Sequence, residues 1–95
     1  MPKKSRTWPP ELETLDQLLG DDMPVSVICR FYPTPDACRK GLLGLLHEGD
    51  VILLNPEQSQ IPQWRRRELF SQDDWLQKLR DFRLRITEQG ANKME

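Results

Sequence analysis

The junction within residues 34–55, "TPDACRKGLLGLLHEGDVILLN", constrains the fold more than any other part of the chain. Thr34 is a good helix N-cap and Pro35 suits the first helical position, so a helix is predicted to begin there. Gly49 is the residue type that commonly ends a helix. The unbroken apolar run in "DVILLN" follows at once and predicts a strand. The sequence therefore predicts a helix over residues 34–48 that leads directly into a strand.

The predicted helix over residues 34–48 has one apolar face. The residues at i, i+4, i+7 and i+8 that form its expected buried stripe are Cys38, Leu42, Leu45 and Leu46. Gly41 and Gly44 are unusual inside a helix, since each costs about 1 kcal/mol relative to alanine. We therefore expect another backbone to approach this helix closely.

Two shorter helices are predicted before this one. The segment "PPELETLDQLLGDD" has prolines at its start, acids in its first turn and Gly20 just past its end. Its expected apolar face is Leu12, Leu15, Leu18 and Leu19. In "MPVSVICRFYP" apolar residues recur every three positions, which favours a helix, although its β-branched residues leave a strand as the alternative.

After the apolar strand, the sequence predicts a β-hairpin and then a long helix. The hairpin spans residues 51–70, with "PEQSQ" as its loop and "IPQWRRRELF" as its returning strand. The long helix spans residues 71–90, from Ser71 as its cap to Gly90 as its stop. Its apolar stripe is Trp75, Leu79, Phe82 and Ile86. Trp64 and Trp75 are both expected in the core, because a small domain needs large side chains to bury enough surface.

Composition places the chain among small globular domains. Its 95 residues make one domain, and its longest apolar run is too short to cross a membrane. The basic start of the chain has no apolar segment behind it, so no secretory signal is expected and a cytoplasmic location is favoured. Residues 1–8 are expected to form a flexible basic arm, and residues 91–95 a frayed tail. Trp8 either holds that arm on the domain or contacts a partner.

The cysteines and the histidine give no metal or catalytic pattern. Cys29, Cys38 and His47 do not make the four-ligand spacing of a zinc site. Free thiols in a reducing cytoplasm are favoured, although a disulfide would join the two middle helices. No triad, phosphate-binding glycine loop or metal motif is present, so neither an enzyme nor a bound cofactor is expected. His47 is interpreted as a favourable charge near a helix end.

The order helix, helix, helix, hairpin, helix resembles a winged helix-turn-helix domain. The resemblance is carried by "GLLGLLHEGDVILLN", which runs from a leucine-spaced helix through a glycine into an apolar strand, and by the basic "WRRRELF". It implies a mainly α fold with a small β-hairpin, a winged-helix domain over residues 9–70 and an added C-terminal helix over 71–90. That helix either packs on the domain or pairs with a second copy, through Trp75, Leu79, Phe82 and Ile86.

The resemblance implies a small DNA-binding transcriptional regulator, bacterial or phage-like and dimeric, whose partner is double-stranded DNA. The helix over residues 34–48 would enter the major groove, and the hairpin would contact the backbone. The net charge is −1, but basic residues are clustered, which permits binding to phosphates. The expected DNA-contacting residues are Asp36, Arg39 and Lys40 in the helix, Gln58, Ser59, Gln60, Arg65, Arg66 and Arg67 in the hairpin, and Lys3, Lys4 and Arg6 in the arm.

The alternative interpretation is a winged-helix protein-interaction module, an adaptor or assembly factor, that does not bind DNA. Leu43 falls off the buried stripe, and an exposed leucine there suits a protein partner, as do Trp8 and the C-terminal stripe. The two interpretations differ in one geometric respect. DNA binding requires Arg39, Lys40 and the arginine cluster to share one face. The alternative expects those charges to be scattered or internally paired. A solvated edge strand would also explain the arginines.

Overall fold

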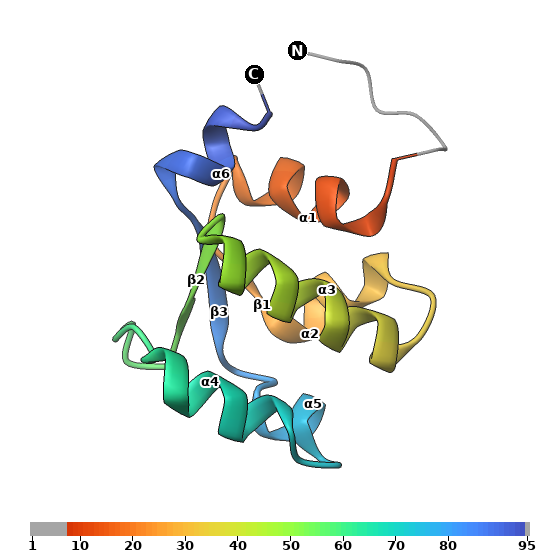
Figure 1. Cartoon of the computed structure of the whole chain (residues 1–95), viewed down its shortest axis with the longest axis vertical. Coiled ribbons are helices and arrows are strands. Elements are labelled where there is room, and N and C mark those ends of the chain that lie inside the picture. The colour runs from red at the N-terminus through yellow and green to blue at the C-terminus, as the bar shows by residue number, and fades with distance from the viewer. Residues whose placement is uncertain (1–7, 95) are drawn as a thin grey trace.

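The computed structural model describes residues 8–94, and it is mainly helical with a small antiparallel sheet (Figure 1). In chain order its elements are α1 (Pro10–Leu18), β1 (Met23–Pro24), α2 (Val25–Ile28), the 3-10 turn η1 (Cys29–Phe31), α3 (Pro35–Glu48), β2 (Val51–Leu54), α4 (Gln63–Phe70), α5 (Trp75–Lys78), β3 (Arg83–Ile86) and α6 (Glu88–Asn92). The predicted class, mainly α with a small β component, is confirmed.

The sheet has the strand order β1-β3-β2, so the last strand lies between the first two. β2 and β3 pair antiparallel, with Val51 opposite Ile86 and Leu54 opposite Arg83. β1 adds two residue pairs on the other edge of β3. Figure 1 shows α1, α3 and α4 one above another, with β2 and β3 near the left side of this stack.

The prediction for α3 is confirmed at both ends and on its buried face, and the prediction for the face of α1 is confirmed in part. The Thr34 hydroxyl accepts a hydrogen bond from the Ala37 amide at 3.1 Å, which caps α3. Gly49 ends α3 with φ of 85°, in the left-handed region that favours glycine. The four predicted stripe residues of α3 are all buried. In α1, Leu15 and Leu18 are buried, but Leu19 is 39% exposed, contrary to prediction.

The prediction of a returning strand over residues 61–70 is wrong, since residues 63–70 form α4. The chain does turn back after β2, and Leu54 makes a single β-bridge to Gln60. Pro62 then serves as the N-cap of α4. Arg66, Leu69 and Phe70 are spaced at i, i+3 and i+4, so a helix buries Leu69 and Phe70 together, which a strand would not do.

The prediction of one long helix over residues 71–90 is also wrong. This segment holds the single turn of α5, then β3, then the start of α6. In β3 the residues alternate between exposed and inward-facing positions, with Arg83 and Arg85 outside and Leu84 fully buried. This period of two is the pattern of a half-buried strand, and pairing with β2 satisfies its backbone.

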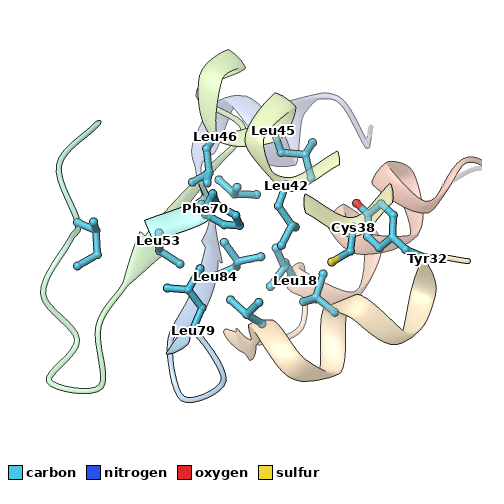
Figure 2. Packing of buried hydrophobic residues seen from close by; sticks show 14 of the residues in the cluster. Leu18, Tyr32, Cys38, Leu42, Leu45, Leu46, Leu53, Phe70, Leu79 and Leu84 are labelled. Atoms are coloured by element: carbon cyan, nitrogen blue, oxygen red, sulfur yellow. The ribbon is translucent and has the colours of Figure 1, made fainter. Parts of the chain in front are cut away.

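The residues predicted as a dimerising stripe contribute to the core of a single chain. Trp75 and Leu79 are buried, and Trp75 lies 5.4 Å from Phe70 between ring centroids. Phe82 and Ile86 are half-buried against the same core. Figure 2 shows Leu79, Leu84 and Phe70 gathered with the leucines of α3 and β2. These side chains stabilise the domain itself and do not form a continuous face on one helix.

Cys29 and Cys38 form a disulfide, so the prediction of free thiols is wrong. Their Cα atoms lie 5.4 Å apart because η1 packs against the first turn of α3. The bond joins the two middle helices. Closing a loop of this size stabilises a fold by roughly 2 to 3 kcal/mol in the chain-entropy model.

The end of the chain holds the α3–β2 junction in place, although it was expected to be frayed. The buried Asp50 carboxylate accepts hydrogen bonds from Lys93 Nζ at 2.7 Å and Gln89 Nε2 at 2.9 Å. This contact with Asp50 raises the pKa of Lys93. Thr87 Oγ1 donates to the Gly49 carbonyl at 2.6 Å, and Met94 is buried. Contacts from Thr87, Gln89 and Lys93 therefore hold the turn through which the chain passes from α3 into β2.

The two glycines inside α3 are expected to respond oppositely to alanine. A Cβ at Gly41 would lie 2.5 Å from Tyr32 Cε2, so Gly41→Ala is expected to destabilise the fold. A Cβ at Gly44 would meet no heavy atom within 4 Å, so the close approach predicted there is absent. Gly44→Ala should raise the free energy of unfolding by about 0.5 to 1 kcal/mol. Urea denaturation of both variants measures the two changes in stability. Equal changes would contradict the prediction that they have opposite signs.

Tyr32 is expected to make the fold sensitive to high pH. Its side chain is 7% exposed, and burial, reinforced by the charge of Glu11, raises its pKa to about 12 despite the hydrogen bond to Thr14. In the unfolded chain this pKa is near 10. Above pH 10 the unfolded chain therefore loses this proton first, and stability should fall by roughly 2 to 3 kcal/mol between pH 10 and 12.

Tyr32 is the one tyrosine in the chain, so its phenolate absorbance can be followed directly. We expect the folded protein to titrate near pH 12 and the protein in denaturant to titrate near pH 10. A folded-state titration near pH 10 would show that Tyr32 is not buried as described.

Candidate nucleic-acid interface

The exposed face of α3 carries the residues that were predicted to read DNA. Asp36, Arg39, Lys40, Leu43 and His47 are separated by three or four positions, so they share one side of the helix. The opposite side holds the buried stripe. The predicted site residues of α3 are therefore brought together on a surface, as expected.

α4 lies beside α3 (Figure 1), and residues of both helices line one groove. Two of its arginines, Arg66 and Arg67, line the groove together with Arg39 and Lys40 of α3, and the hollow between them has a volume of about 430 Å³. The other lining residues are Leu43, Leu46, His47, Gln63, Phe70 and Ser71. Two helices that are separated in sequence thus place four cationic side chains around one hollow. We call this hollow the α3–α4 groove.

The α3–α4 groove includes apolar side chains among its cationic residues. Leu46 and Phe70 are buried in the core beneath it, and Leu43 is half-buried. Figure 2 shows Phe70 close to Leu46 and Leu42, so the lining residues Leu46 and Phe70 belong to the packed interior. The positions of α3 and α4 are therefore set by core packing, which presents the charged rim on a rigid support.

The acid on this face is already paired with its neighbouring bases. Arg39 Nη2 donates to Asp36 Oδ1 at 2.5 Å, and Lys40 Nζ lies 3.4 Å from Asp36 Oδ2. The hydrogen bond from Arg39, followed by that from Lys40, lowers the pKa of Asp36 below its usual value. Asp36 thus neutralises part of the charge on α3 and orients both bases along one side of the helix.

The two arginines of α4 are less well compensated. Neither Arg66 nor Arg67 makes an ion pair with any residue in the 8–94 range. Arg66 is half-buried, and this burial lowers its pKa. A guanidinium that is partly removed from water and lacks a carboxylate is stabilised by an incoming anion. The α3–α4 groove is therefore suited to phosphate or carboxylate groups.

Other predicted site residues lie outside the α3–α4 groove. Arg65 does not line the groove and has Glu68 as its ion-pair partner at 3.7 Å. The expected hairpin tip is an exposed turn after β2, in which Gln58 has φ of 67°. Gln58, Ser59 and Gln60 do not line the groove. Lys3, Lys4 and Arg6 lie outside the described residues.

Trp64 is the main surface residue that the sequence interpretation missed. It was expected in the core, but it is 66% exposed on α4. A helix over residues 63–70 would have predicted the exposure of Trp64, because it places Trp64 on a different side of the helix from the buried Leu69 and Phe70. Trp75 is buried as predicted, and Trp8 packs against the core from before α1.

Residues 8–94 show neither a membrane-spanning helix nor a candidate metal-ion site. Within this range no helix combines the length and the apolar character needed to cross a bilayer. The same residues contain no cluster of three histidine, cysteine, aspartate or glutamate side chains placed to hold a metal ion. Comparison of the chain with protein-family models, with curated proteins and with solved structures gave no match.

Proposed function

We propose that this chain is a small winged-helix DNA-binding protein of the transcriptional-regulator type and that the α3–α4 groove is its contact surface. One observation carries the proposal. Arg39 and Lys40 of α3 line the same hollow as Arg66 and Arg67 of α4. Cations that gather on one face can bind several phosphates together. Cations that are scattered over the surface cannot.

The connection of the elements supports a winged-helix assignment. α3 ends at Gly49, runs into the apolar strand β2, and β2 is paired by a returning strand that carries two arginines. The family pattern is a helix, a glycine stop, an apolar strand and a basic returning strand. Here β3 is the returning strand, and α4 and α5 occupy the connection that a simple hairpin turn would otherwise make.

In the proposed mode of binding, α3 and α4 contact different parts of the DNA. The N-terminal half of α3 would face the major groove, with Arg39 and Lys40 nearest the bases and backbone. α4 would lie along a neighbouring phosphate strand, with Arg66 and Arg67 as its contacts. α4 thereby takes the role that the sequence assigned to a hairpin. The absence of a carboxylate partner for Arg66 among residues 8–94 favours this, because a phosphate would supply the missing negative charge.

Leu43 favours a second candidate of a different class. It is half-buried on the exposed face of α3 and lines the same groove. An acidic amphipathic helix of another protein would place its apolar face on Leu43 and its carboxylates on the surrounding arginines. The adaptor function considered from the sequence would then use the same groove.

A salt titration with a labelled random duplex tests the proposed function. We expect fluorescence anisotropy to show binding that weakens as salt rises. If all four groove cations contact phosphates, the log–log slope should be roughly −3 to −4, at about 0.9 per phosphate. Absence of binding at low salt would refute DNA binding. Binding of a labelled acidic helical peptide under those conditions would then establish the second candidate.

A further inference from the structure

The surface of α4 next to the groove carries an exposed aromatic ring that the proposed duplex contact leaves unused. Among residues 8–94 the large hydrophobic side chains that are exposed are Trp64 and Leu19, and Trp64 is the more exposed of the two. The described residues give Trp64 no aromatic partner, since the ring contact in this range joins Phe70 and Trp75. An indole left this open contributes little to folding and is available for binding.

Trp64 lies at the edge of the α3–α4 groove. A second, shallow hollow on α4 is lined by Gln63, Trp64 and Arg67. Gln63 and Arg67 also line the α3–α4 groove, so the two hollows adjoin along these residues. Arg67 is three positions after Trp64, about one helical turn. The ring therefore lies beside a cation that the proposed function assigns to a phosphate.

The chemistry of this corner matches a single nucleotide. A flat indole stacks on any nucleobase, a guanidinium pairs with the attached phosphate, and the Gln63 amide can both donate and accept hydrogen bonds at a base edge. A base inside a duplex is covered on both faces by its neighbours. An indole on the protein surface can therefore stack on an unpaired base but not on a base inside a duplex.

From this geometry we infer that Trp64 stacks on an unpaired base while the α3–α4 groove holds the adjoining backbone. The preferred ligand is then DNA with unpaired nucleotides next to a duplex, such as a duplex with a single-stranded overhang. The inference rests on the proposed function, because the duplex side of this ligand uses the same arginines. Charge complementarity to phosphates around the ring favours this occupant over an apolar protein surface.

Matched DNA probes test the inference. A blunt duplex, the same duplex with a single-stranded overhang of a few nucleotides, and the overhang strand alone are titrated by anisotropy at one salt concentration. Wild-type protein should bind the overhang duplex about 10-fold more tightly than the blunt one, the effect of one stacked base. Trp64→Ala should remove that preference while leaving blunt-duplex affinity unchanged, and Trp64→Phe should retain part of it. Leu19→Ala, at the other exposed apolar residue, should change neither the affinity for the blunt duplex nor that for the overhang duplex.

The outcomes separate this inference from the proposed function. If wild-type protein binds blunt and overhang duplexes equally, the stacking inference fails while duplex binding stands. The same conclusion follows if Trp64→Ala weakens both duplexes by the same factor. If no DNA probe binds, both fail. A labelled acidic helical peptide whose binding depends on Trp64 would then identify a protein partner instead and overturn the inference.

Discussion

Leu79→Ala is expected to lower the free energy of unfolding by about 2 to 5 kcal/mol, the range observed for buried leucines. Leu79 is fully buried in the core cluster, between the turn of α5 and the sheet. Truncation removes its apolar contacts and leaves a cavity that neighbouring side chains fill only in part. The loss should be independent of protein concentration, because the contacts lie within one chain. Urea denaturation at two protein concentrations measures both quantities.

The control for Leu79 is a leucine on the surface. Leu19 is 39% exposed, so Leu19→Ala should change stability by no more than about 0.5 kcal/mol. If Leu79 formed a dimer seam, Leu79→Ala would instead halve the mass in sedimentation, and its loss of stability would depend on protein concentration. That result would restore the long C-terminal helix that the sequence predicted.

Reversing the charges of Arg66 and Arg67 is expected to abolish most duplex binding. Each charge-assisted contact is worth about 1.5 to 3 kcal/mol, so loss of both should weaken affinity by at least roughly 100-fold. Two glutamates would add repulsion from the phosphates. The fold should persist, because neither arginine makes an ion pair within residues 8–94. Anisotropy with a random duplex measures the affinity, and circular dichroism checks the fold.

The matched control reverses two cations elsewhere on the surface. Lys78 and Arg80 are exposed, and neither lines the α3–α4 groove. Lys78→Glu combined with Arg80→Glu makes the same change in net charge and should weaken binding far less. Equal losses in the two double variants would mean that only total charge matters, and the groove would then have no special role.

The sequence predicted the part of the molecule whose local signals agree. Thr34, Gly49 and the leucine spacing of α3 all indicate the same helix, and the packing preserves it. The run after Gly49 is apolar enough to be buried on both faces, so β2 was also predictable. α4 was missed because a returning strand was expected, and in a strand successive side chains face opposite sides. Leu69 and Phe70 are adjacent and both buried, which fits a helix instead.

Longer-range features could not be read from the chain. β3 was not predicted because Trp75, Leu79, Phe82 and Ile86 have the spacing of a helical stripe. Its pairing with β1 and β2 shows that it is a strand. The disulfide depends on η1 meeting α3, a tertiary contact between residues nine apart in sequence. The residues of the candidate site could be predicted, but their arrangement could not. Arg39, Lys40, Arg66 and Arg67 were named, but the helix that brings them together was not.

An amide NMR titration with blunt duplex tests the central claim most directly, because it locates the contact residue by residue. We predict that the amides of residues 39–43 and 63–67 shift, while those of α1 and α6 stay in place. Shifts that fade with added salt would fit phosphate contacts. Shifts confined to α1 or α6, or no shifts at low salt, would contradict the claim that the α3–α4 groove binds DNA.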